Sequence, residues 1–163
     1  MTEHSPAGEA FRAIIQRADR PLSGAVAAQP SKNYTTRLLL AAALAEGESL
    51  VRNIAASEDA AALRECLGNL GAEIAVTQAS DGRFDARVNG FGATPRLSAG
   101  GRINPGNAGA VLRFLLGVGA LLPQVTFVTD RPDSLGKRPN SDMLDALAQM
   151  GCRAESDGGF LPI

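Results

Sequence analysis

The stretch Pro30-Ser31-Lys32-Asn33-Tyr34-Thr35-Thr36-Arg37 leads directly into the apolar run from Leu38 to Ala45. Polar, hydroxyl-bearing residues followed by strong helix formers are typical of a helix N-terminus. The first turn of a helix leaves backbone N–H groups unpaired and carries the positive end of the helix dipole, so it attracts anions. We therefore predict a helix from about residue 31 to 45 whose beginning binds a phosphate or a carboxylate.

Two cations in this stretch support an anion site. Lys32 would act as a compact point charge, and Arg37 would offer a planar fork to a carboxylate or phosphate. A cation in the first turn opposes the dipole, so Lys32 costs some stability unless an anion is present. The alternative interpretation is that Ser31 caps the helix while Lys32 and Arg37 are solvated on its exposed face.

The composition indicates a globular protein with a sizeable core. The chain has 163 residues, 45% of them hydrophobic and 20% charged, and a net charge of -1. This balance excludes a general attraction to nucleic acid or membranes, and no signal peptide or membrane span is found. Cys66 and Cys152 lack metal-site spacing, and His4, the only histidine, lies in a polar tail. We expect a reduced, cytoplasmic protein without a metal.

Turn residues and apolar periodicity predict alternating strands and helices. Around the helices at 31–45 and 57–70, we expect strands at 25–29, 49–54, 73–78 and 83–89. We expect the first helix to end at a glycine, Gly47. From residue 96 the pattern restarts, with strands at 97–99, 125–129, 153–156 and 160–163 and with helices at 110–122 and from 141. The predicted element order is βαβαββ, followed by a second such unit.

Two matches between the halves indicate an internal duplication. Residues 33–37 align with 109–113 at an offset of 76, and residues 67–72 align with 147–152 at an offset of 80. We expect residues 1–23 to be a tail and lead-in strand and 24–163 to be a partial lobe. Unit one spans about 24–92 and unit two about 95–163, and unit two is expected to be truncated in its sixth element.

Two more segments carry candidate chemistry. In Gly106-Asn107-Ala108-Gly109, small residues allow backbone N–H groups to approach an oxyanion, and Asn107 can cap the next helix or donate. In the segment 133–139, Pro139 keeps Arg138 extended, so that its guanidinium could reach the same site. The alternatives are a tight glycine loop and a solvated basic loop, respectively.

Together these motifs resemble the 5-enolpyruvylshikimate-3-phosphate synthase family from about residue 16 onward. The motifs are Pro30-Ser31-Lys32, the helix 37–47, Ser57–Asp59, Gly106–Gly109 with Arg113, and Lys137-Arg138-Pro139. The resemblance implies an α/β (α+β) enolpyruvyl transferase fold of six βαβαββ units, of which about two are present. It implies transfer of the enolpyruvyl group from phosphoenolpyruvate to shikimate 3-phosphate in aromatic amino acid biosynthesis, without a metal or organic cofactor.

The resemblance also implies site residues: Lys32, Asn33, Arg37, Asn107, Gly109 and Arg138. Lys32 resembles the catalytic lysine that contacts both substrates, Asn33 and Arg37 resemble shikimate 3-phosphate contacts, and Gly109 and Arg138 resemble phosphoenolpyruvate contacts. The sequence departs from the family where Phe114 replaces a common proline.

The family's acid–base residues come from later in the chain. The resemblance therefore implies a substrate-binding N-terminal part that is inactive alone and has the C-terminal part of the same enzyme as its partner. Two alternatives stay open: a non-catalytic phosphometabolite-binding fragment or remnant, and a relative of UDP-N-acetylglucosamine enolpyruvyl transferase.

Overall fold

The computed structural model describes residues 14–26, 28–97 and 101–163. Its elements, in chain order, are α1 (Lys32–Leu44), β1 (Glu46–Ile54), α2 (Glu58–Asn69), β2 (Glu73–Gln78), β3 (Phe84–Phe91), β4 (Arg102–Ile103), α3 (Gly109–Gly119), β5 (Thr126–Phe127), a 3-10 turn η1 (Leu135–Lys137) and α4 (Ser141–Gln149). Among the described residues, no helix has both the length and the apolar character needed to cross a bilayer. His4 lies outside the described residues.

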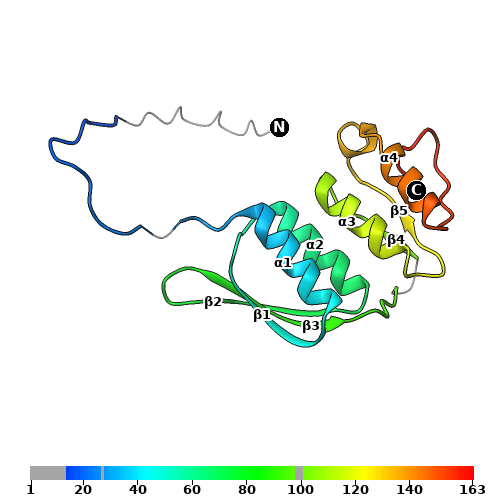
Figure 1. Cartoon of the computed structure of the whole chain (residues 1–163), viewed down its shortest axis with the longest axis horizontal. Coiled ribbons are helices and arrows are strands. Elements are labelled where there is room, and N and C mark those ends of the chain that lie inside the picture. Colours follow the sequence, from blue (N-terminus) through cyan, green and yellow to red (C-terminus); the bar gives the residue numbers. More distant parts are fainter. Residues whose placement is uncertain (1–13, 27, 98–100) are drawn as a thin grey trace, which may run out of the picture.

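Strands β1, β3 and β2 form an antiparallel sheet in that order, and α1 and α2 lie side by side on one face of it (Figure 1). Because successive side chains of a strand point to opposite faces, β3 turns Ala86 and Val88 into the core, where both are fully buried. The opposite face is charged, and Arg87 Nη1 lies 2.6 Å from Glu48 Oε1. The predicted helices and strands of this first unit are confirmed from α1 onward.

Helix α1 begins as the sequence predicts. The side chain of Ser31 caps it by accepting a hydrogen bond from the backbone N–H of Tyr34 at 3.4 Å, and Leu39 is fully buried against the sheet. The prediction of a glycine end at Gly47 is wrong. Ala45 is already extended, and Gly47 lies within β1, so the chain passes from helix to strand without a left-handed cap.

Helix α2 is defined by its caps and its apolar stripe. Ser57 Oγ accepts from Ala60 N at 3.3 Å, and the predicted stripe residues Leu63 and Leu67 are fully buried. The helix ends where Gly71 adopts a φ of 102°, a left-handed conformation that glycine adopts without steric cost. This end directs the chain into β2, under the helix layer.

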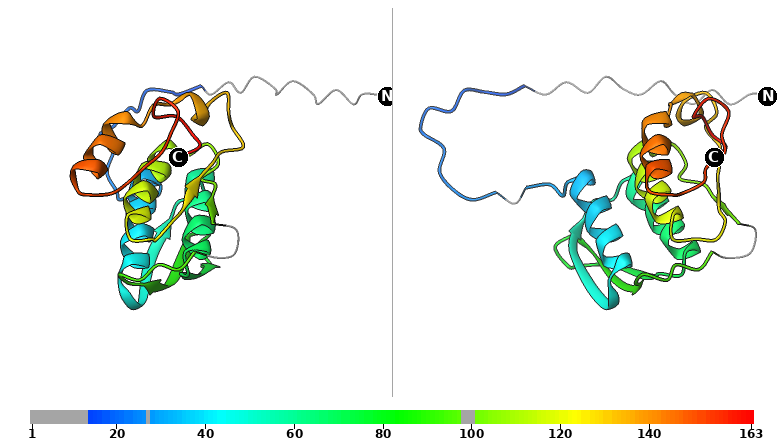
Figure 2. Two further views of the ribbon diagram at one scale, coloured as in Figure 1. Left: turned by 90° about the vertical axis from the view of Figure 1, so that its right-hand side faces the viewer. Right: turned by 45° about the vertical axis from the view of Figure 1, so that its right-hand side comes forward.

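The second unit packs beside the first (Figure 2). Strands β4 and β5 are parallel, and Phe127 of β5 exchanges two backbone hydrogen bonds with Ile163, at 2.8 and 3.1 Å. This antiparallel pairing repeats the pairing of β1 with β3 in the first unit. Helix α3 supplies Leu112 and Leu115, both fully buried, to the shared core. The molecule thus has the mixed α/β fold that the sequence predicts.

The structure differs from several of the short strands that the sequence predicts. The described residues of 25–29 form no strand, and Val26 is 94% exposed. Leu97 is irregular, residues 98 and 99 lie outside the described residues, and the strand before α3 is Arg102–Ile103. The strand predicted at 125–129 shortens to Thr126–Phe127, and residues 153–156 are irregular. Short strands depend on a neighbouring edge for hydrogen bonds, which a local pattern does not reveal.

Candidate functional site

The N-terminal ends of α1, α2 and α3 lie toward the same side of the molecule (Figure 1). Lys32 in the first turn of α1 contacts Asp59 in the first turn of α2, with Nζ 3.3 Å from Oδ2. The guanidinium of Arg37 lies over the ring of Phe114 in α3, 5.1 Å from its centroid. The two duplicated helix starts are therefore neighbours in space, as the duplication predicts.

A hollow of about 490 Å³ opens beside these helix starts. The lining residues come from the start of α2, the loop before α3 and the loop after β5: Glu58, Asp59, Ala62, Gly106, Asn107, Ala108, Asp130, Arg131 and Ser134. Three of them are carboxylates and one is a guanidinium, while the Lys32 ammonium stands at the edge through its contact with Asp59. Cations bind anionic groups, and carboxylates accept hydrogen bonds from hydroxyl groups, so this lining suits a ligand that carries both.

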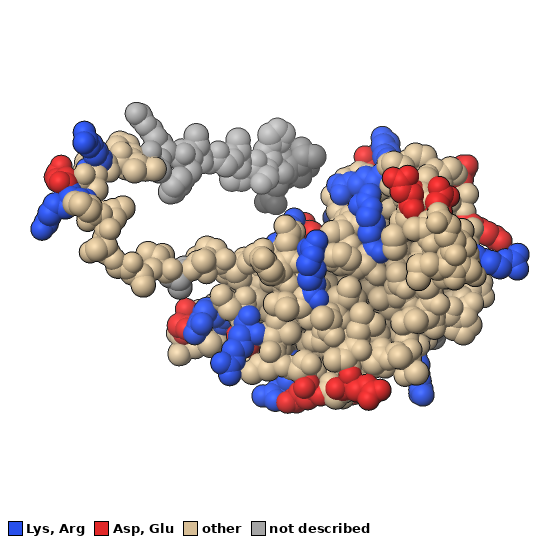
Figure 3. Space-filling view, in the orientation of Figure 1, with Lys and Arg blue, Asp and Glu red and all other residues tan. Residues whose placement is uncertain are grey.

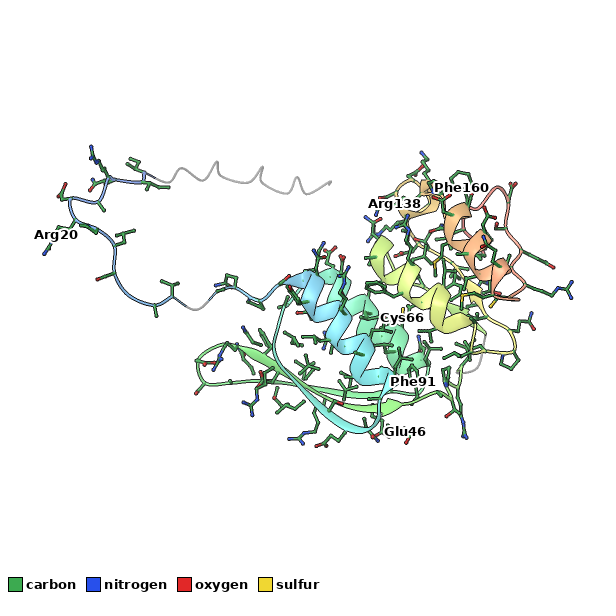
Figure 4. All side chains as sticks on the ribbon, viewed as in Figure 1. Arg20, Glu46, Cys66, Phe91, Arg138 and Phe160 are labelled. Atoms are coloured by element: carbon green, nitrogen blue, oxygen red, sulfur yellow. The ribbon has the colours of Figure 1, made fainter. Side chains whose placement is uncertain are left out.

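Two guanidinium groups stand over the first residue of α3. A Cβ atom placed on Gly109 would lie 2.8 Å from Arg138 Nη1 and 3.4 Å from Arg113 Nη1. Arg113 Nη2 donates to the carbonyl oxygen of Pro139 at 3.4 Å, and Arg138 Nη2 donates to Ser134 Oγ at 3.4 Å. Figure 4 shows Arg138 beside this end of α3, and Figure 3 shows basic side chains over it. A side chain at Gly109 would displace the Arg138 guanidinium from this position.

The loop before α3 is held in place from both sides. Thr129 Oγ1 donates to the carbonyl oxygen of Gly106 at 2.7 Å, and Asn104 Oδ1 accepts from the N–H of Gly106 at 2.9 Å. Gly106 has a φ of 61°, which favours glycine. The backbone near the hollow is therefore fixed by the end of β5 rather than by local turn residues alone.

The structure brings some predicted site residues together and leaves others apart. Of the predicted site residues, only Asn107 lines the hollow. Lys32 reaches its edge through Asp59, and Arg138 lies over Gly109 beside it. Asn33 and Arg37 are not among the lining residues. Arg37 Nη1 instead donates to the carbonyl oxygen of Asn33 at 2.9 Å. The prediction that Asn107 could cap α3 is wrong, because Ala108 is the N-cap residue and has no side-chain capping bond.

Sequence reasoning missed several residues at this place. The sequence indicates Asp59 as part of a helix start and of the motif Ser57–Asp59, but not as the partner of Lys32. Acidic first-turn residues are nevertheless natural partners for a neighbouring lysine. Arg113, four residues after Gly109 on the same helix face, had a readable signal in the i, i+4 spacing. Thr129 and Arg131 had none, because the folding of β5 against β4 brings Arg131 to the hollow and Thr129 to the carbonyl oxygen of Gly106.

The buried thiol behind the site has an elevated pKa. Burial, and to a smaller degree the neighbouring charge of Glu65, raise the pKa of Cys66 to about 12, and its Sγ donates to the carbonyl oxygen of Asn104 at 3.4 Å. A thiol in this state is a poor nucleophile at neutral pH. The described residues also hold no group of three or more His, Cys, Asp or Glu side chains arranged for a metal ion.

A second hollow, of about 470 Å³, lies between the end of α3, β5 and α4. Its lining is mostly apolar, with Leu116, Phe127 and Leu147 among the residues, and it contains none of the predicted site residues. We assign the candidate site to the hollow at the helix starts, since that one adjoins the cations and the unpaired N–H groups.

Comparison with known proteins matches residues 16–163 to the family model for EPSP synthase (3-phosphoshikimate 1-carboxyvinyltransferase). The chain is 53% identical over 163 residues to the 3-phosphoshikimate 1-carboxyvinyltransferase of Deinococcus radiodurans, covering all of this chain and 35% of that protein. It is 37% identical over 131 residues to the enzyme of that name from Methanopyrus kandleri, covering 80% of this chain and 30% of that protein. It thus spans about a third of the length of these curated relatives.

A solved EPSP synthase structure from Acinetobacter baumannii has the same fold as this chain. The TM-score is 0.67 at 24% sequence identity, over 82% of this chain and 30% of that chain. The family model covers almost the whole chain, and the relatives are well above the identity at which families are recognised. The chain belongs to the EPSP synthase family.

Proposed function

We propose that this chain provides a substrate-binding part of 3-phosphoshikimate 1-carboxyvinyltransferase, which joins the enolpyruvyl group of phosphoenolpyruvate to shikimate 3-phosphate. Membership of the family supports this function. The observation that carries it is the arrangement at the helix starts, where Arg138 lies over Gly109 and Lys32 stands beside the neighbouring hollow. Two anionic substrates repel each other in water, and clustered cations with backbone donors offset that repulsion.

The proposed roles follow from position. Lys32 lies at the start of α1 and contacts Asp59 of the hollow, where it could contact both substrates, and it is the proposed catalytic residue. Gly109 and Arg138 would bind the phosphate or carboxylate of phosphoenolpyruvate, together with the Asn107 loop. Asn33 and Arg37 would bind shikimate 3-phosphate, whose hydroxyl groups suit the carboxylates of the hollow.

Calorimetric titration with shikimate 3-phosphate and with phosphoenolpyruvate tests this proposal. We expect Lys32→Ala to weaken the binding of both ligands by roughly tenfold or more, because charge-assisted contacts contribute about 1.5–3 kcal/mol each. The control is Arg83→Ala, since Arg83 is an exposed cation that pairs with Asp81 in the turn between β2 and β3, outside the hollow. The absence of binding by the parent chain, or equal losses in both variants, would contradict the proposal.

We further propose that turnover requires the remaining length of the synthase, as the family resemblance implies. Phosphate release from both substrates should be undetectable with the chain alone and should appear when a complementary segment of a relative is added. Turnover by the chain alone, near that of a full synthase, would refute this part. Binding without turnover in either case would favour the alternative, a non-catalytic binding protein.

A further inference from the structure

Asn140, the residue before α4, uses its side chain in an unusual way. Asparagine at a helix N-cap normally accepts a hydrogen bond from the first turn through its side-chain oxygen. The Asn140 side chain makes no capping bond, although the residue is only 3% exposed. Its amide nitrogen instead donates to the carbonyl oxygen of Arg138 at 3.0 Å and to that of Gly159 at 3.3 Å.

The side-chain oxygen of Asn140 is buried without a partner in the described structure. A buried unpaired acceptor is costly, and an apolar residue of similar size would avoid that cost. The presence of an amide at this position is therefore explained by the two hydrogen bonds that its nitrogen donates. One of these bonds fixes the carbonyl group of Arg138.

The guanidinium of Arg138 has little support of its own. Its one side-chain hydrogen bond among the described residues is the contact with Ser134, which is long at 3.4 Å. Arg138 is extended, with φ -90° and ψ 120°, because Pro139 follows it. The direction of the side chain over Gly109 thus depends on the orientation of the Arg138 peptide, whose carbonyl group Asn140 holds.

Asn140 also forms hydrogen bonds to the turn that contains Gly159. The backbone N–H of Asn140 also donates to the carbonyl oxygen of Gly159, at 2.9 Å. Gly159 has a φ of 80°, and a Cβ atom there would collide with the hydroxyl of Ser141. Asn140 therefore connects the Arg138 loop to a turn that packs closely on the start of α4.

We propose that Asn140 is a positioning residue for the anion site: its amide orients the Arg138 peptide so that the guanidinium stays over Gly109. Its importance for substrate binding rests on the proposed function, in which Arg138 binds phosphoenolpyruvate. In the ligand-free chain, independently of that function, Asn140 keeps the Arg138 side chain ordered.

The test compares Asn140→Ser and Asn140→Asp with the parent by NMR. Both substitutions keep a good N-cap residue and remove the amide donor. The matched control is Ser141→Ala, which removes a weak bond of 3.5 Å to the carbonyl oxygen of Gly158 in the same turn without touching Arg138. The readout is the order parameter of the Arg138 Nε–Hε group, with the exposed Arg52 as the internal reference.

We expect the Arg138 order parameter to fall below about 0.6, the range of flexible groups, in both Asn140 variants and to be unchanged in Ser141→Ala. The backbone amides of α4 should keep their values. An Arg138 order parameter equal to that of the parent in a folded variant overturns the proposal. If neither Asn140 variant folds, the role is general to the fold and the proposal is also overturned.

A double-mutant cycle separates this proposal from the proposed function. Asn140→Ser should weaken phosphoenolpyruvate binding by roughly fivefold in the parent chain and have no further effect in an Arg138→Ala background. Equal losses in both backgrounds would show that Asn140 does not act through Arg138. If the parent does not bind phosphoenolpyruvate, the proposed function fails, while the NMR comparison still decides the role of Asn140.

Discussion

At the scale of single residues, Gly109 is the position in the candidate site where an added side chain would meet the Arg138 guanidinium. A methyl group there would lie 2.8 Å from Arg138 Nη1, closer than side chains pack. We expect Gly109→Ala to displace the Arg138 guanidinium and to weaken phosphoenolpyruvate binding at least tenfold, roughly the effect of losing one charge-assisted hydrogen bond. Calorimetry measures this change.

The control for that substitution is Gly117→Ala in the same helix. Its added methyl group would meet only Met143 Cε, at an ordinary 3.8 Å. Alanine has a better helix propensity than glycine, so we expect a gain of up to about 1 kcal/mol in the free energy of unfolding and unchanged binding. Equal effects of the two substitutions on binding would show that the contact with Arg138 is unimportant.

The ion pair of Lys32 with Asp59 competes with the proposed ligand binding to Lys32. The Lys32 side chain is 54% exposed and that of Asp59 is 28% exposed, so the pair contributes at most about 1 kcal/mol to stability. Asp59→Asn removes the competing carboxylate and should strengthen the binding of phosphoenolpyruvate, with little change in the melting temperature. Weaker binding in this variant would mean that Asp59 contacts the ligand favourably.

The buried thiol of Cys66 makes the stability of the fold depend on pH in the alkaline range. Its folded-state pKa of about 12 lies above the ordinary value of 9.0, so the folded chain holds the proton more tightly than the unfolded chain. The resulting stability is present below pH 9 and is lost as the pH rises toward 12. We expect a thiol reagent at pH 8 to leave Cys66 unlabelled in the folded chain and to label it in denaturant. Rapid labelling of Cys66 in the folded chain would contradict its burial.

At the scale of elements, the close contact of α1 with β3 depends on Gly90. A Cβ atom there would collide with the carbonyl oxygen of Ala45 and would lie 2.5 Å from that of Ala42. We expect Gly90→Ala to lower the free energy of unfolding by about 3 kcal/mol, because backbone atoms cannot move aside as a side chain does. Denaturant unfolding measures this loss.

The comparison variant for Gly90→Ala is Gly68→Ala, on helix α2. No heavy atom lies within 4 Å of its added methyl group, so we expect a small gain from helix propensity. A loss in Gly68→Ala as large as that in Gly90→Ala would show that the helix contact with β3 is not the cause.

The elements that the sequence predicted well carry local signals. Helices α1 and α2 are marked by their N-caps, Ser31 and Ser57, and α2 also by its leucine stripe. These signals involve residues close together in the sequence, so they can be recognised without knowing the rest of the fold. The wrong strand at 25–29 had a similar local pattern but found no neighbouring edge in the described chain. Strands form between partners far apart in sequence, and this information is absent from a short window.

In the candidate site, too, the features with local signals could be predicted and the long-range contacts could not. Lys32 and Gly109 were predictable because a helix start attracts anions wherever it occurs. The contact of Lys32 with Asp59, and the position of Arg138 over Gly109, join residues 27 and 29 positions apart and could not be read from local pattern. The segment 133–139 and the family resemblance both indicated Arg138, and the family motifs contained Asp59 and Arg113. The structure supplied the contacts of Asp59 and Arg113, and it added Thr129.

At the scale of the whole molecule, the two units place equivalent helix starts at one side of a shared core. The contact of Arg37 with Phe114 joins the helix that starts each unit, and the core residues of both units form one cluster. Under the proposed function, duplication would explain how one simple feature, a helix start, becomes a site with several cations. The apolar hollow lies at the end of α3 and contains none of the predicted site residues.

The most direct test of a shared anion site is an NMR titration of the chain with phosphoenolpyruvate and shikimate 3-phosphate together. We predict saturable shifts of backbone amides that group at residues 31–37, 58–59, 106–109 and 131–138, and that are much reduced in Lys32→Ala. Shifts confined to the outer face of the sheet or to the apolar hollow, or no saturable shifts at all, would contradict the shared site.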